Sequence, residues 1–105
     1  ILDEVRNKVA VVPVSPLNRF ANGFSHIFAG GYAAGYYSYK WAEVLAADAF
    51  GRFIESGVFD RKAGQDFEDL ILSCGGACDM MENFVKFRGR EPQVEALLKQ
   101  SGINN

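Results

Sequence analysis

Apolar residues recur at three- and four-residue steps along most of the chain, which is the spacing of a helix with one buried face. The longest such stretch runs from about Tyr32 to Ser56-Gly57. No segment alternates apolar and polar residues with the period of two that is typical of a half-buried strand. The pattern therefore predicts an all-α fold.

Shorter helices are predicted on both sides of the long one. Leu2, Val5 and Val9 lie on one face of a short amphipathic helix, which the prolines at 13 and 16 must end. Three further helices follow the long one, each with a capping residue or proline before it and a glycine after it. Asp60, Asp79 and Pro92 mark the three starts, and Gly75, Gly89 and Gly102 mark the three ends.

These elements predict a single helical fragment over residues 1–105 with three parts. Residues 1–17 form a short helix and a connector, and residues 18–39 form a loop rich in Gly and Tyr that leads into the long helix. Residues 40–105 form a helical bundle. We expect the apolar side chains from Phe50 to Leu98, Met80 and Met81 included, to form its core.

Composition narrows the possible partners. The 105 residues are 49% hydrophobic and 23% charged, as in an ordinary soluble domain. A formal charge of -2 with scattered Lys and Arg provides no basic surface for nucleic acid. No apolar run approaches the roughly 18 to 20 residues that span a bilayer, and the first residues lack a signal-peptide layout. We therefore expect a cytoplasmic protein without nucleic-acid or membrane partners.

Two cysteines, Cys74 and Cys78, flank a Gly-Gly-Ala sequence. Two thiols without a second pair of Cys or His cannot complete a tetrahedral structural zinc site. In a cytoplasmic protein we expect both to be reduced and unlinked.

Residues 24–41 carry the chain's one His, its one Trp, all four Tyr and three of its eleven Gly. Imidazole and phenol groups are costly to bury without partners, so this segment is predicted to contact another molecule. If the helix begins at Tyr32, then Tyr32, Tyr36 and Tyr39 share one face and could bind a peptide or a developing oxyanion. The alternative is that these tyrosines pack in a helix interface with their hydroxyls at its rim.

Self-contained catalytic chemistry is not favoured. A metal held by His26 would need carboxylates, and Glu43, Asp48 and Glu55 are spaced too unevenly to converge on one ion. Ser25 next to His26 lacks an identifiable orienting acid for a nucleophilic triad. The glycines at 30, 31 and 35 lack the Lys-Ser/Thr ending of a phosphate-binding loop.

The sequence Phe-Ser-His-Ile-Phe-Ala-Gly-Gly-Tyr-Ala-Ala-Gly-Tyr-Tyr-Ser-Tyr-Lys-Trp strongly resembles the C-terminal part of zinc metallopeptidases of the thimet oligopeptidase and dipeptidyl carboxypeptidase family. The resemblance continues through Gly-Val-Phe-Asp, Ile-Leu-Ser-Cys-Gly-Gly and Phe-Arg-Gly-Arg-Glu-Pro to Ser-Gly-Ile, and so covers nearly the whole chain. It implies the helical C-terminal fragment of a larger, two-lobed, zincin-like oligopeptidase that hydrolyses short peptides.

In that family, two His and a Glu of a His-Glu-x-x-His helix, together with a downstream Glu, supply the zinc ligands and the general base. This chain has one His and no such motif. The resemblance therefore implies that zinc belongs to a full-length parent with ligands outside this chain, and that the fragment alone holds no metal and is inactive.

The resemblance assigns roles within the segment from Ser25 to Tyr39. Tyr39 and Tyr32 correspond to the catalytic phenols that contact the scissile carbonyl and stabilise its oxyanion. His26 corresponds to the imidazole that binds the peptide backbone, and Tyr36 to a further substrate-facing phenol. The glycines at 30, 31 and 35 correspond to the flexible substrate-binding loop.

Cys74 and Cys78 depart from the family pattern around the Gly-Gly turn. A rival function is a stand-alone helical peptide-binding module without chemistry, and a third is a structural helical domain. Because a fragment exposes a former interface, we expect self-association through apolar side chains such as Phe20, Phe24, Phe28 and Tyr37.

Overall fold

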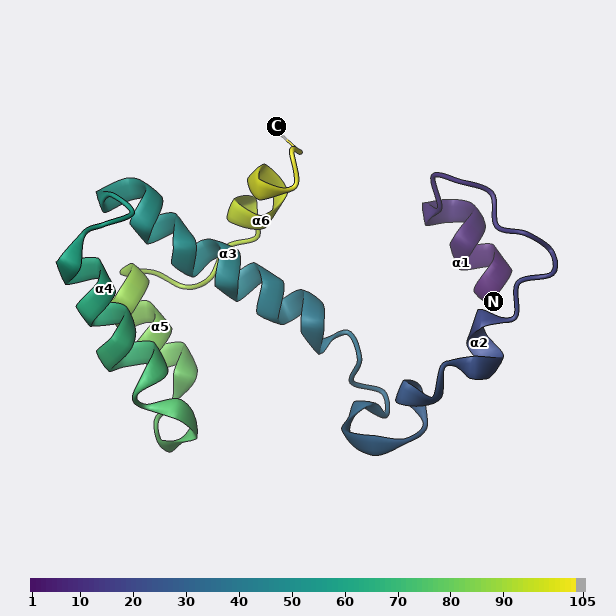
Figure 1. Cartoon of the computed structure of the whole chain (residues 1–105), viewed down its shortest axis with the longest axis horizontal. Coiled ribbons are helices and arrows are strands. Elements are labelled where there is room, and N and C mark those ends of the chain that lie inside the picture. The colour runs from purple at the N-terminus through teal and green to yellow at the C-terminus, as the bar shows by residue number, and fades with distance from the viewer. Residues whose placement is uncertain (104–105) are drawn as a thin grey trace. The chain divides into compact units, whose positions relative to one another are not determined.

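The computed structural model describes residues 1–103, and within them every regular element is helical and no strand is present. The chain divides into two compact units, one comprising Ile1–Tyr36 and the other beginning at Tyr37 (Figure 1). The predicted all-α fold is confirmed.

The first unit contains α1 (Leu2–Val9), α2 (Phe20–Gly23) and two single turns of 3₁₀-helix, η1 (Ser25–Ile27) and η2 (Gly30–Tyr32). The predicted N-terminal helix is confirmed by α1, which has acidic residues in its first turn and basic residues in its last, as the helix dipole favours. Short helical turns occupy much of the segment for which the sequence predicted only an irregular loop. None of these four elements contains a buried residue.

The long helix of the second unit, α3 (Ser38–Ser56), is the longest element, as predicted, but it does not begin near Tyr32. Gly35 N donates to the Tyr32 carbonyl at 2.9 Å, and Ala34 has a left-handed φ of 53°. A left-handed residue cannot continue a right-handed helix, so a turn separates Tyr32 from α3. At the other end Gly57, with φ 110°, stops the helix where the sequence predicted.

The next helix, α4 (Arg61–Phe67), starts at the predicted cap. The Asp60 carboxylate accepts hydrogen bonds from the backbone N–H groups of Lys62 and Ala63 at 2.7 and 2.9 Å. The chain continues as one wider π-helical segment, η3 (Glu68–Leu72), and then as a 3₁₀ turn, η4 (Gly75–Ala77). The predicted helix from Asp60 to the Gly-Gly pair is thus present in outline, with a change of helix type after Phe67.

The last two helices are α5 (Met80–Arg88) and α6 (Glu95–Gln100), of which α6 packs against α3 (Figure 1). Asp79 accepts from the N–H of Glu82 at 2.9 Å, and Gly89 ends α5 in the left-handed conformation with φ 77°, both as predicted. The prediction that Pro92 lies in the first turn of the last helix is wrong. The N–H of Gln93 donates to the Asp48 carboxylate at 2.8 Å, and α6 starts only after this contact.

The core of the second unit is small and aromatic. Ala49, Phe84 and Phe87 are buried, and Phe53, Phe67, Leu70 and Ile71 pack against them. The rings of Phe53, Phe67 and Phe87 lie with centroids 5.5 to 6.3 Å apart in tilted or edge-to-face arrangements, which aromatic quadrupoles favour. These contacts join α3, α4 and α5 around one centre.

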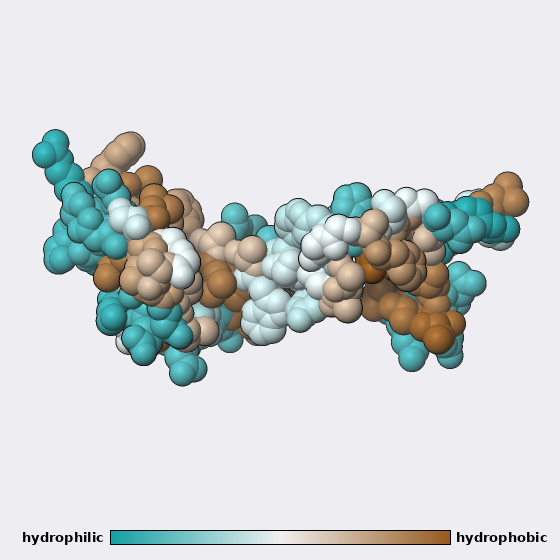
Figure 2. Space-filling model, turned by 90° about the horizontal axis from the view of Figure 1, so that it is seen from below, coloured by the Kyte–Doolittle hydropathy of each residue, from teal (hydrophilic) through white to brown (hydrophobic). Residues whose placement is uncertain are grey.

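Several side chains expected in this core are exposed, among them Phe50, Ile54, Phe59 and Leu72 as well as two methionines. Met80 and Met81 are 43% and 51% exposed, and together with Leu45 and Phe50 they line an apolar groove of about 570 Å³. We call this the α3–α5 groove; its remaining lining comes from Ala46, Ala49, Phe53, Phe67, Ile71 and Phe84. Apolar side chains coloured brown reach the surface of each unit in Figure 2. The prediction of a fully buried core over Phe50 to Leu98 is therefore wrong for these side chains.

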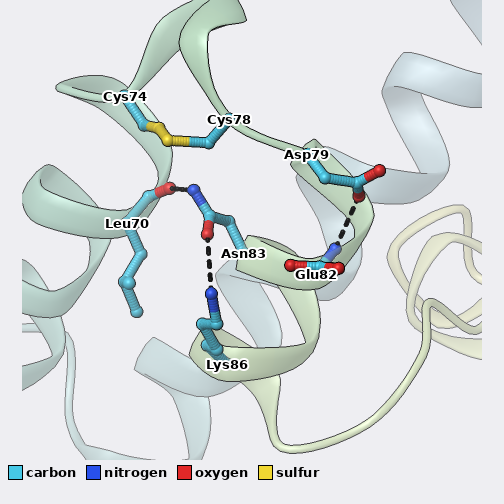
Figure 3. Close-up of a disulfide and its surroundings, with 7 residues drawn as sticks. All are labelled: Leu70, Cys74, Cys78, Asp79, Glu82, Asn83 and Lys86. Atoms are coloured by element: carbon cyan, nitrogen blue, oxygen red, sulfur yellow. Dashed lines mark hydrogen bonds between the residues drawn. A yellow bond between two sulfur atoms is a disulfide. The ribbon is translucent and has the colours of Figure 1, made fainter.

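The two cysteines are joined by a disulfide (Figure 3), so the prediction that they are unlinked is wrong. The three residues between them form η4, in which Ala77 N donates to the Cys74 carbonyl at 3.0 Å and Gly75 has φ 51°. This tight turn holds the two Cα atoms 6.0 Å apart, within the range that a disulfide spans. The sequence indicated a turn at the Gly-Gly pair, but not that this turn brings the two thiols together.

Candidate functional site

Five ring side chains of the first unit form a cluster in which His26 contacts Phe24, Tyr32 and Tyr36, and Phe20 stacks on Phe24. We call these five residues the His26 cluster. The imidazole stacks on the Phe24 ring, with centroids 5.2 Å apart and planes 26° apart. Tyr32 and Tyr36 each lie 5.7 Å from the imidazole and 5.5 Å from one another. Three predicted site residues, His26, Tyr32 and Tyr36, are therefore brought together.

The backbone brings them together through consecutive tight turns. His26 lies in η1, where Phe28 N and Ala29 N both donate to the Ser25 carbonyl at 2.9 and 2.8 Å. Gly30, the first residue of η2, has a left-handed φ of 77°, a conformation that glycine adopts without steric cost. The η2 turn then contacts η1. Tyr32 ends η2, and Tyr36 follows the turn that the Tyr32 carbonyl closes.

The polar members of the cluster can be reached from solvent. His26 and Tyr36 are exposed, whereas Tyr32 and Phe24 are half-buried. The partly covered phenylalanine provides a flat apolar support for the exposed imidazole. A molecule bound at this surface would meet an imidazole and phenol groups, which can donate or accept hydrogen bonds.

Tyr39, the other predicted catalytic residue, lies in the first turn of α3 in the second unit and is 51% exposed. The predicted arrangement, with three tyrosines on one face of a single helix, is wrong because no helix runs from Tyr32 to Tyr39. Gly30 and Gly31 belong to η2, and Gly35 lies in the turn after it. Only Gly30 of these three has a left-handed φ.

A second polar cluster lies in the second unit and was not predicted from the sequence. Asp48, on α3, has a fully buried side chain that accepts hydrogen bonds from Arg88 at 3.1 Å and Arg90 at 2.6 and 2.7 Å. The backbone N–H of Gln93 donates the fourth hydrogen bond to this carboxylate. Arg88 also makes a bidentate pair with Glu55, at 2.8 and 2.9 Å. The α3 helix is thereby tied to the segment between α5 and α6.

The electrostatics of this cluster are dominated by these contacts. Burial alone would raise the pKa of Asp48, but hydrogen bonds from Arg90, the Gln93 N–H and Arg88 hold it below its ordinary value. The hydrogen bond from Arg88 likewise lowers the pKa of the exposed Glu55. The carboxylates of Asp48 and Glu55 are thus both hydrogen-bonded to arginine side chains. A sequence signal for the cluster exists, since a charged residue among the alanines of α3 needs a buried partner, and Arg-Gly-Arg supplies two.

Across residues 1–103, no three His, Cys, Asp or Glu side chains are grouped so that they could hold a metal ion. Of the acidic residues considered from the sequence as partners for His26, Glu43 pairs with Lys40 at 2.7 Å, and the other two are bound to arginines. The donor set in this part of the chain therefore does not fit zinc.

The model of a known family, described as Peptidase family M3, matches residues 1–103. The chain is 61% identical over 102 residues to "Oligopeptidase A" of Escherichia coli, covering 97% of this chain and 15% of that protein. It is 56% identical over 100 residues to "Probable cytosolic oligopeptidase A" of Arabidopsis thaliana, covering 91% of this chain and 14% of that protein.

A more distant relative is "Dipeptidyl carboxypeptidase" of Salmonella typhimurium, which is 40% identical over 93 residues, covering 89% of this chain and 14% of the relative. The chain thus spans about 15% of the length of the oligopeptidase A relatives that it matches. Both the His26 cluster and the Asp48 cluster fall within the matched residues.

Proposed function

Because this chain belongs to peptidase family M3, we propose that it is the peptide-holding and oxyanion-stabilising part of a zinc-dependent oligopeptidase that hydrolyses short peptides. The relatives at 56% to 61% identity carry the name oligopeptidase A, which describes cleavage of oligopeptides. Since this chain spans only a small part of those proteins, the activity is proposed for a longer polypeptide.

The observation that carries the proposal is the grouping of His26, Tyr32 and Tyr36 in one accessible cluster. A peptide in extended form presents backbone N–H and carbonyl groups that imidazole and phenol side chains can bind. Phe24 stacks against His26 and restricts the ring's orientation. We assign His26 and Tyr36 to binding of the substrate backbone, with glycines 30, 31 and 35 letting the loop approach it.

Tyr39 and Tyr32 are assigned to the reacting carbonyl. As water adds to a peptide carbonyl, its oxygen gains negative charge, and a phenol O–H directed at that oxygen donates a stronger hydrogen bond than it does to the substrate. This difference lowers the barrier rather than merely tightening binding. The two phenols therefore act as oxyanion donors, while His26 holds the substrate already in the ground state.

We infer that zinc is bound outside this chain, and the proposal is supported by residues 1–103, where no three His, Cys, Asp or Glu side chains are grouped so that they could hold a metal ion. The sequence also lacks a His-Glu-x-x-His motif, since it contains one His. We place the metal and the general base in the remainder of a longer polypeptide. The isolated chain is accordingly proposed to be inactive.

A cytoplasmic location belongs to the same proposal, and one Arabidopsis relative is named as cytosolic. Within residues 1–103, no helix combines the length and the apolar character needed to cross a membrane. Fractionation of cells that express the tagged protein, with cytoplasmic and membrane markers, tests the location.

The kinetic test uses a chimera in which the matching segment of Escherichia coli oligopeptidase A is replaced by the 102 residues of this chain that align with it. Tyr39→Phe removes one hydroxyl and little volume, so folding should persist while oxyanion stabilisation is lost. We expect kcat to fall by about 10²- to 10³-fold, as for loss of an oxyanion donor. The measurement is steady-state cleavage of a short quenched peptide, with metal content determined for each variant.

The matched control is Tyr37→Phe, which removes the same hydroxyl from an adjacent tyrosine that is 65% exposed and has no assigned role. It should leave kcat within about threefold of the unmodified chimera. His26→Ala should raise KM as well as lower kcat, because its contacts precede the transition state. If Tyr39→Phe behaves like Tyr37→Phe, Tyr39 is not an oxyanion donor; if the isolated chain binds peptides unaided, the stand-alone binding module is favoured.

A further inference from the structure

We propose that Cys74 and Cys78 form a site of reversible thiol–disulfide exchange, and that its redox state decides whether the start of α5 is held in place. The modifying reagent is a small thiol of the glutathione class. Oxidation closes the ring around η4, and reduction releases it.

The disulfide lies in a part of the chain that is not buried. Cys78 is exposed and Cys74 is half-buried, and each residue of the turn between them is exposed. Thiol–disulfide exchange requires a thiolate to approach one sulfur along the S–S axis, so access governs which sulfur is attacked. Cys78 is the more exposed residue of the pair, and we assign its Sγ as the target.

The disulfide ties together two elements that meet near one end of the α3–α5 groove. Cys74 follows η3, and Cys78 immediately precedes Asp79, whose carboxylate caps α5 (Figure 3). The next two residues, Met80 and Met81, line the groove. Fixing Cys78 therefore restrains both the cap of α5 and the two methionines.

Other contacts limit how far a change at this site can spread. Asn83 Nδ2 donates to the Leu70 carbonyl at 2.9 Å, which is a second link between η3 and α5 that needs no disulfide (Figure 3). Phe84, the next residue along α5, and Phe87, one turn further, are buried in the core. Reduction should therefore loosen residues 75–82 and leave the rest of α5 packed.

The exchange balances in two steps. A thiolate attacks Cys78 Sγ, the S–S bond breaks, and its electron pair leaves with Cys74 Sγ, which takes up a proton. A second thiolate attacks the sulfur of the bound small thiol, and Cys78 Sγ leaves and is protonated. The protein disulfide gains two electrons and two protons, and two small thiols become one oxidised disulfide. Oxidised glutathione drives the reverse reaction.

The test titrates the full 105-residue chain with glutathione mixtures, traps free thiols by alkylation and counts them by intact mass. As the fraction of reduced glutathione rises, the two cysteines should change together from a disulfide-bonded pair to two alkylated thiols. Amide hydrogen exchange is then measured on each end state. Loss of the constraint from a five-residue closed ring should speed exchange of residues 77–82 by about 30-fold, by the loop-entropy relation. Residues 84–88 should stay within about twofold.

The control is the double variant Cys74→Ser, Cys78→Ser, which should exchange like the reduced chain in both buffers. The reduced wild-type chain also lacks the disulfide and carries no substitution. Its hydrogen exchange therefore tests the proposal even if the double variant does not fold. Persistence of the bridge at every glutathione ratio, failure to form it, or equal exchange of residues 77–82 in both redox states would overturn the proposal. None of these readouts depends on peptide cleavage.

Discussion

At the scale of single residues, Asp48 is the most constrained group in the second unit. Its carboxylate is fully buried and accepts hydrogen bonds from two guanidinium groups and a backbone N–H. Removing Asp48 would leave the buried Arg88 guanidinium with Glu55 as its remaining acidic partner and would take two hydrogen bonds from Arg90, which is more costly than losing the attraction itself. Asp48 therefore matters for stability through the arginines that it satisfies.

We expect Asp48→Ala to lower the free energy of unfolding by about 3 to 5 kcal/mol. The control is Glu43→Ala, which removes an exposed carboxylate paired with Lys40 on the same helix and should change stability by less than about 0.5 kcal/mol. Urea denaturation followed by circular dichroism measures both. Equal effects of the two substitutions would show that the Asp48 cluster does not stabilise the fold.

Acid should destabilise the second unit for a related reason. Hydrogen bonds from Arg52 and Lys62 lower the pKa of Asp66, and the arginine contacts lower the pKa of Asp48, each from an ordinary value of 3.8. A carboxylate with a lowered folded pKa stabilises the fold fully above its unfolded pKa. That stability is lost as the pH falls through the lower folded value.

Near neutral pH, we expect the titration of these carboxylates to leave the free energy of unfolding unchanged. Below about pH 4, we expect that free energy to decrease as the pH falls. Urea titrations at a series of pH values measure it. Asp66→Asn should weaken the decrease, because its side chain no longer titrates. A stability that rises as the pH falls below 4 would contradict the predicted direction.

At the scale of elements, helix ends were predicted best where a local side chain determines them. Asp60 and Asp79 cap α4 and α5 through contacts within three residues, and Gly57 and Gly89 end helices through positive φ values. The prediction failed where a distant group intervened: Asp48 binds the Gln93 N–H and delays the start of α6 beyond Pro92. Local caps are readable from sequence because their partners are adjacent.

We expect Asp60→Ala to lower the free energy of unfolding by about 1 kcal/mol, because two N–H groups lose their acceptor. Asp60→Asn retains an acceptor oxygen and is the matched control, with a smaller loss. Denaturant melts measure stability, and amide exchange at Lys62 and Ala63 reports the first turn. If Asp60→Ala and Asp60→Asn are indistinguishable, the carboxylate does not act as a cap.

At the scale of the whole molecule, apolar surface is abundant. No helix or 3₁₀ turn of the first unit contains a buried residue. In the second unit the α3–α5 groove leaves Phe50, Met80 and Met81 between 43% and 51% exposed. Of the residues expected at an exposed interface, Phe20, Phe28 and Tyr37 are exposed, whereas Phe24 is half-buried. Contiguous apolar surface of this kind favours association.

We therefore predict that the chain self-associates as its concentration rises. Sedimentation velocity over a concentration series should show a growing weight-average sedimentation coefficient, and Met81→Glu should reduce this growth by placing a charge in the groove. Ser73→Glu, at an exposed position outside the groove, makes the same one-unit change in charge and is the control. A strict monomer at every concentration would contradict the prediction.

The sequence predicted which residues form the candidate site, but not how they are arranged. The sequence indicated His26, Tyr32, Tyr36 and Tyr39 because rare polar aromatic residues are concentrated in one segment and match a family pattern. Three of them meet in the His26 cluster through turns, and not on the helix face that their spacing suggested. The left-handed Ala34 makes the difference, since no propensity scale places an alanine there.

The sequence by itself determined the helical class, the capped helix ends and the family, because these depend on neighbours within a few residues or on a long matching pattern. Only the tertiary structure decided that Asp48 meets Arg88 and Arg90, which lie 40 and 42 residues away. It also decided that the methionines line a groove and that η4 closes a disulfide. The physical reason is that burial and pairing depend on which elements pack together, and periodicity specifies a helix face but not its partner.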